Sequence, residues 1–251
     1  MAEIWQTISF NGSSIDIWRI NLKAGAKTLA TAQASLSRAE LARAAHLLME
    51  DDRRRFIMSR AALRSSLSHY LALAPEAIRF SIDAQGQPSL PAHLGWNFSM
   101  ARRRDQAVIA VAQGMQLAIE FETVDLHSEA MFDFANYCCH AGAELPATIS
   151  SSSRTECYRR GVREAVMRKA LGRSAAFVPS LAGVAAEARS PRLLSSDPAN
   201  GKLDDWALLD LEFGDAVAAL MVAHTSQPTV ADEDPCTETL AQQLMRVGYP
   251  W

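Results

Sequence analysis

The chain lacks several features that would place it at once in a familiar class. Its four cysteines form no Cys-x-x-Cys pair, and the adjacent Cys138-Cys139 is a poor disulfide and a poor zinc motif. No stretch is apolar for long enough to span a bilayer, and the first ten residues contain no long apolar region of the signal-peptide kind. We therefore expect a soluble, cytoplasmic protein with reduced thiols and no membrane partner.

An excess of positive charge is also missing. The 251 residues carry a net charge of −3, which argues against a nucleic-acid partner. Gly-rich phosphate loops are absent, and the serines at 150–153 lack the Gly-x-Ser-x-Gly setting of a hydrolase nucleophile. Basic residues gather only locally. For Arg102-Arg103-Arg104, at a predicted turn, we favour a solvated turn over a docking site for an acidic helix.

What the chain does contain is a regular alternation of strand and helix patterns. Asn11-Gly12 marks a turn, and Ser37 followed by Glu40 is a capping box that begins a helix. Gly114 lies at a tight turn inside a predicted β-meander. The patterns predict strands within 4–22 and at 77–83, 95–100, 106–113, 116–124, 206–212 and 216–224, and helices at 38–49, 52–73, 126–142, 153–171 and 237–246.

The order of these elements repeats one theme: strands and helices, then strands and helices again. We predict an α+β fold of two similar lobes packed side by side, with a pseudo-twofold relation between them. The expected division is 1–108 for the first lobe, 109–225 for the second and 226–251 for a tail. Because the pairing of lobes is internal, we expect a monomer.

Three carboxylates are the candidate chemical centre. Glu120 and Glu122 are two residues apart on a predicted strand, so both face the same side, where they repel unless a cation lies between them. Oxygen-only ligands suit Mg²⁺, which also binds phosphate oxygens. Glu164, flanked by Arg163 and Arg168, would complete a metal–phosphate site. Taken alone, a Glu-x-Glu strand is more often a solvated face.

The surroundings of these carboxylates resemble a known family. Motifs in the right order over about residues 13–224 are similar to those of the two-lobed, Sfp-like 4'-phosphopantetheinyl transferases. They are Arg53-Arg54-Arg55-Phe56, Gly86-Gln87-Pro88, Asn97-Phe98-Ser99-Met100-Ala101, Ala118-Ile119-Glu120-Phe121-Glu122 and Arg163-Glu164-Ala165-Val166-Met167-Arg168.

The resemblance implies transfer of the 4'-phosphopantetheine group from coenzyme A to a serine of an apo acyl or peptidyl carrier protein. It implies Mg²⁺ held by Glu120, Glu122 and Glu164, with Glu164 also the base for the serine hydroxyl. It implies further that five residues contact the phosphates of the coenzyme: Arg55, Arg60, Ser99, Arg163 and Arg168.

The chain departs from the family pattern within the site. Glu120 replaces an aspartate, Met100 a histidine, Gln87 a lysine and Arg160 a tryptophan. These losses leave a second hypothesis open, a catalytically degenerate relative that binds a carrier protein or another partner.

The register of the second helix is also open. The run Lys169-Ala170-Leu171-Gly172 matches the family's helix end one position late, which would put Ala165 in the catalytic position. We prefer the register with Glu164, because the other buries Arg168, which is costly without a partner.

Overall fold

The computed structural model describes residues 2–82, 87–124, 151–171, 192–193, 206–214 and 216–224. It contains helices together with two four-stranded sheets, so the mixed α and β character is confirmed. Among the described helices, none is long and apolar enough to cross a membrane. The predicted helices at 126–142 and 237–246 and the tail at 226–251 lie outside the described residues.

The first sheet is antiparallel and has the strand order β1-β2-β6-β5. Its strands are β1 (Ala2–Phe10), β2 (Ser13–Asn21), β5 (Trp96–Arg103) and β6 (Gln106–Gln113). The predicted turn at Asn11-Gly12 joins β1 to β2, with φ of 48° and 83° at its two residues. Both angles are left-handed, as a two-residue hairpin turn requires, and Asn and Gly tolerate them best.

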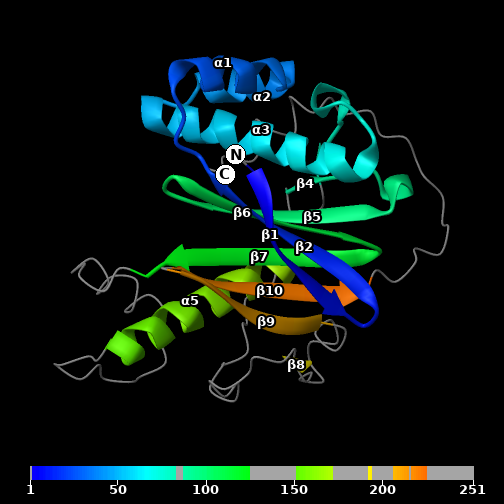
Figure 1. The fold of residues 1–251 in the computed structure, drawn as a ribbon, viewed down its shortest axis with the longest axis vertical. Coiled ribbons are helices and arrows are strands. Elements are labelled where there is room, and N and C mark those ends of the chain that lie inside the picture. The colour runs from blue at the N-terminus through cyan, green and yellow to red at the C-terminus, as the bar shows by residue number, and fades with distance from the viewer. Residues whose placement is uncertain are drawn as a thin grey trace.

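Three helices follow β2: α1 (Ala26–Ala34), α2 (Arg38–Ala45) and α3 (Glu50–Leu71). Helix α3 lies on the outer face of this sheet, and α1 and α2 pack on α3 (Figure 1). The predicted capping box at the start of α2 is confirmed, with Ser37 and Glu40 each accepting from the other's backbone N–H. Leu63 and Leu67 of α3 pack on Trp18, Ile20 and Ile109 of the sheet.

The predicted strand at 77–83 shrinks to two residues. Pro75–Ala77 forms a short 3-10 helix, η1, and only β3 (Ser81–Ile82) pairs with β4 (Pro88–Ser89). A second 3-10 turn, η2 (Ala92–Leu94), leads into β5.

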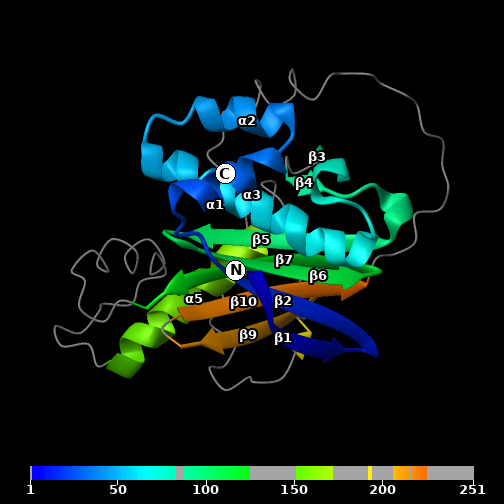
Figure 2. The ribbon, with the colours of Figure 1, turned by 45° about the horizontal axis from the view of Figure 1, so that its top comes forward.

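The second sheet is also antiparallel, with the order β7-β10-β9-β8. It contains β7 (Met115–Thr123), β8 (Arg192–Leu193), β9 (Trp206–Phe213) and β10 (Ala216–His224). One long helix, α5 (Ser151–Leu171), covers its outer face through Tyr158, Val162, Val166 and Met167. In both ribbon views α5 lies on the opposite side of the sheets from α1–α3 (Figure 2).

The inner faces of the two sheets share one core. Ile17, Val108 and Ala110 of the first sheet pack with Ile119, Phe121 and Leu220 of the second. The predicted β-meander is therefore wrong in one respect: β6 and β7 belong to different sheets, and the chain crosses at Gly114, where φ is 66°. The first sheet ends at Gln113, so the predicted lobe boundary at 108 falls within β6. The pseudo-twofold relation stays a prediction.

Candidate functional site

Glu120 and Glu122 lie side by side on the face of β7 that α5 covers. Their partners on β10 are Ala219 and Val217, both buried against α5, whereas Ile119 and Phe121 enter the core between the sheets. The predicted common face of the two carboxylates is thus confirmed. The exposed fractions of the side chains are 14% for Glu120 and 23% for Glu122, so the pair is largely shielded from water.

Arg103 bridges the two carboxylates from the end of β5. Its Nε lies 3.0 Å from Oε2 of Glu122, and its Nη2 lies 3.1 Å from Oε2 of Glu120. Its Nη1 donates to the carbonyl of Arg102 at 3.0 Å. A planar guanidinium can hold two carboxylates in this fixed geometry. Our interpretation of the arginine run as a solvated turn is therefore wrong for Arg103, because the two sheets bring β5 next to β7.

Lys169 of α5 contributes a second cation to the same pair. Its Nζ donates to Oε1 of Glu120 at 3.0 Å, to the carbonyl of Met100 at 2.7 Å and to the carbonyl of Ile119 at 3.0 Å. An ammonium group has three N–H donors, so all of them are used. The Lys169 side chain is only 12% exposed.

Glu164 takes a different position. Its carboxylate pairs with Arg160 at 3.5 Å and Arg168 at 3.9 Å, both on its own helix. Val166 packs on the sheet, and two residues along an α-helix are rotated by about 160° from each other. Glu164 therefore lies on the side of α5 away from the sheet, whereas Lys169 lies on the sheet side.

The predicted magnesium cluster is consequently not assembled. Among the described residues, no three His, Cys, Asp or Glu side chains are grouped so that they could hold a metal ion. The oxygen donors of Glu120 and Glu122 suit Mg²⁺ chemically, but two protein cations already neutralise them. As placed, these residues do not fit the metal.

Arg163 and Arg168, both predicted to bind phosphate, differ in their surroundings. Arg163 is buried and forms a bidentate pair with Asp210 of β9, with 2.9 Å between Nε and Oδ1. This hydrogen bond raises the pKa of Arg163. The Arg168 side chain is 41% exposed. The structure thus uses Arg163 to attach α5 to the second sheet.

Ser99 joins the two sheets near the carboxylate pair. Its hydroxyl is buried and accepts a hydrogen bond from the backbone N–H of Ile119 at 3.0 Å. The next residue, Met100, contributes its carbonyl to Lys169, while its side chain packs with the cluster beneath α3. Ser99, predicted to contact phosphate, and the neighbouring Met100 therefore lie next to Lys169 and its partner Glu120.

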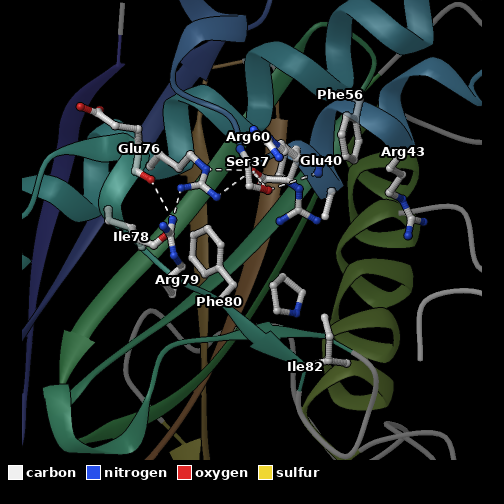
Figure 3. Close-up of a pocket in the computed structure, with 14 residues that line it drawn as sticks. Ser37, Glu40, Arg43, Phe56, Arg60, Glu76, Ile78, Arg79, Phe80 and Ile82 are labelled. Carbon is white, nitrogen blue, oxygen red and sulfur yellow. Dashed lines mark hydrogen bonds and ion pairs between the residues drawn. The ribbon is translucent and has the colours of Figure 1, made fainter. Parts of the chain in front are cut away.

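A pocket of about 530 Å³ opens in the first half of the chain, between α2, α3, η1 and β3–β4 (Figure 3). Phe56, Phe80 and Pro88 contribute apolar walls, and five arginines contribute positive charge: Arg38, Arg43, Arg60, Arg64 and Arg79. Arg64 has fewer N–H donors left for a ligand, because it pairs with Glu40 and donates to the carbonyls of Pro75 and Ile78. An apolar pocket with several cations suits an anion that carries a flat, apolar group.

Of the two predicted nucleotide arginines, Arg60 lines this pocket and Arg55 does not. Arg60 is 7% exposed and lies 5.5 Å from the ring centre of Phe56. Burial lowers the pKa of Arg60 to about 10, so it stays charged at neutral pH. Arg55 instead pairs with Asp105 at 2.9 Å and Asp52 at 3.2 Å.

Adjacent residues of β5 link the pocket to the carboxylate pair. Arg102 donates to Ser59 of α3 at 3.4 Å, and its charge contributes to lowering the pKa of Arg60. Arg103, on the opposite face of the strand, reaches Glu120 and Glu122.

The sequence did not predict a role for Arg103, Lys169 or Asp210. Alternation along β5 would have placed Arg102 and Arg103 on opposite faces of the strand, but the partners of each depend on tertiary contacts.

Comparison with known proteins gives an informative likeness. No protein-family profile matches the chain. The chain is 31% identical, over 219 residues, to "4'-phosphopantetheinyl transferase HetI" from Nostoc sp. (strain PCC 7120). The matched region covers 83% of this chain and 87% of the Nostoc protein, so the likeness is not confined to one motif.

Proposed function

The chain belongs to the 4'-phosphopantetheinyl transferase family, and from this premise we propose that it transfers the 4'-phosphopantetheine group of coenzyme A to a serine of an apo acyl or peptidyl carrier protein. The observation that carries the proposal is the 31% identity over nearly the whole length of the Nostoc transferase. The cationic pocket supports it, because the coenzyme carries a phosphorylated nucleotide.

In the proposed reaction the serine Oγ attacks the phosphorus that carries the pantetheine arm. A new O–P bond forms, the P–O bond to the bridging oxygen breaks, and adenosine 3',5'-bisphosphate leaves with the electron pair. Positive charge near the diphosphate stabilises the leaving group. Arg103 and Lys169 are the cations closest to the carboxylate pair, but the three N–H donors of Lys169 are already used within the protein. Glu164 stays the predicted acceptor of the serine proton, and its place on the face of α5 away from the sheet counts against that role.

The nucleotide end of the coenzyme is proposed to enter the pocket lined by Arg60. Arg60 forms no hydrogen bond or ion pair with the other described residues, so its N–H donors are available to a phosphate. Phe56 and Phe80 offer apolar surface to the base. The magnesium requirement predicted from the resemblance does not enter this proposal, because Arg103 and Lys169 already pair with Glu120 and Glu122.

Mass spectrometry tests the transfer directly. The protein is incubated with coenzyme A and a panel of apo carrier proteins, and we expect one carrier to gain the mass of a phosphopantetheine group. Glu122→Ala should abolish the gain without unfolding the protein, whereas Glu50→Ala, at an exposed position on α3, should not. Coenzyme binding without a mass gain on any carrier would count against the transferase.

The second hypothesis, a degenerate relative that binds a carrier protein, is favoured by the position of Glu164. Glu164 lies apart from Glu120 and Glu122, and both of those carboxylates are neutralised. A binding protein of this kind should retain an apo carrier protein in a pull-down and show no mass gain on it. The predicted cytoplasmic location and monomeric state stay predictions.

A further inference from the structure

The charged group on β7 consists of Glu120, Glu122, Arg103 and Lys169, drawn from β5, β7 and α5. We call it the four-charge cluster. Two negative and two positive charges balance within it. Each carboxylate oxygen accepts a hydrogen bond: Glu120 from Lys169 and Arg103, and Glu122 from Arg103 and from the backbone N–H of Thr123 at 3.1 Å. No counter-charge from solution is needed.

The two cations are held in place by more than the carboxylates. Lys169 also donates to the carbonyls of Met100 and Ile119, and Arg103 to that of Arg102. A metal ion at the pair would have to displace both cations and compete with hydrogen bonds already formed. Mg²⁺ also requires near-octahedral oxygen ligands and gives up water reluctantly.

We propose that Arg103 and Lys169 supply, from within the chain, the positive charge that a divalent ion would otherwise bring to Glu120 and Glu122. The four-charge cluster then binds no Mg²⁺ in the free protein. Its cations are bound covalently to the fold, so they stay beside the carboxylates when chelator is added. The link to catalysis rests on the proposed function, but the charge balance itself does not.

The cluster makes a specific prediction about metal binding. Removing the cations leaves two neighbouring carboxylates that repel each other, which is the situation that favours capture of a divalent ion. The double variant Arg103→Met/Lys169→Met keeps the apolar stems and removes the two charges. The matched control Arg104→Met/Lys27→Met removes the same charges from exposed positions.

Calorimetric titration with MgCl₂ on the full chain, without coenzyme or carrier, measures this. The wild type and the control should show no saturable binding up to about 10 mM Mg²⁺ and no rise in Tm. The cation-deficient variant should bind Mg²⁺ saturably with a Kd of about 1 mM or less, at least about tenfold below that limit, and be stabilised by it. Adding Glu120→Gln to that variant should remove the gain.

Two results would overturn the proposal. One is saturable Mg²⁺ binding to the wild type that Glu120→Gln/Glu122→Gln abolishes. The other is a cation-deficient variant that is folded by circular dichroism yet gains no affinity. If the double variant does not fold, Arg103→Gln carries the test, since the Arg103 side chain is 37% exposed and its replacement disturbs the core least.

A separate experiment measures the transfer rate in the presence of a metal chelator. If the protein transfers phosphopantetheine, transfer should persist in EDTA within about threefold of its rate in Mg²⁺. Transfer that needs added Mg²⁺ would overturn the proposal for the working enzyme. A complete lack of transfer in both buffers would speak against the proposed function, while the titrations would still decide the state of the four-charge cluster.

Discussion

Arg64 and Glu40 form a buried ion pair that also closes a helix cap. Nη2 of Arg64 lies 2.7 Å from Oε2 of Glu40, and the same oxygen accepts the backbone N–H of Ser37 at 2.9 Å. Only 2% of the Arg64 side chain is exposed. One carboxylate thus fixes the start of α2 and neutralises a cation inside the first half of the chain.

Glu40→Ala should therefore be strongly destabilising. It leaves the Arg64 guanidinium buried without its carboxylate, which costs about 3–5 kcal/mol, and it removes one side of the capping box. Urea unfolding followed by circular dichroism measures the loss. Glu76→Ala, at an exposed position, should change the free energy of unfolding by less than about 0.5 kcal/mol. Equal effects at the two positions would contradict the assigned role of Glu40.

Arg163 and Arg168 provide a second contrast on a single helix. Arg163→Met should lower the free energy of unfolding by about 3 kcal/mol, because it strands Asp210 at the interface of α5 and β9. Arg168→Met should cost less, about 1 kcal/mol at most, since 41% of its side chain is exposed and ion pairs at the surface contribute little. The comparison uses the same unfolding assay. A stable Arg163→Met variant with weakened coenzyme binding would instead favour the predicted phosphate role.

Arg60 should determine the affinity of the pocket for a nucleotide phosphate. We expect Arg60→Met to weaken binding of adenosine 3',5'-bisphosphate by about tenfold or more, the usual effect of losing a charge-assisted hydrogen bond. Calorimetry measures the change. Arg53→Met is the control, because Arg53 donates at the surface to the carbonyl of Leu47. Because the pKa of Arg60 is about 10, binding should be insensitive to its titration between pH 7 and about pH 8. Unchanged affinity in Arg60→Met would exclude the pocket as the nucleotide site.

Asp105 should contribute to acid sensitivity. The hydrogen bond from Arg55 holds the pKa of Asp105 below its usual range. A carboxyl group whose pKa is lowered on folding stabilises the protein above its unfolded pKa, about 3.9, and loses that contribution as the pH falls through the folded value. The difference in Tm between wild type and Asp105→Asn should thus be constant from neutral pH down to about pH 5 and shrink at lower pH. Thermal unfolding across that pH range measures the difference. A Tm difference that persists at acid pH would contradict the assigned role of Asp105.

Much of the local structure followed from short-range patterns. The Asn11-Gly12 turn, the capping box at Ser37 and the strands β5, β7, β9 and β10 were each predicted from a few neighbouring residues. Alternation alone placed Glu120 and Glu122 on one face, because a strand has a period of two and its neighbours settle which face is buried.

The composition of the charged group was decided only by packing. A helix turns by 100° per residue, so the burial of Val166 against the sheet turned Lys169 toward Glu120 and Glu164 away from it. The crossing at Gly114 placed β7 in a second sheet and brought the end of β5, with Arg103, beside it. Contacts between residues that are neighbours along the chain can be predicted from the order of those residues. The meeting of Arg103, Glu120 and Lys169 depends on how sheets and a helix pack, which short-range patterns do not encode.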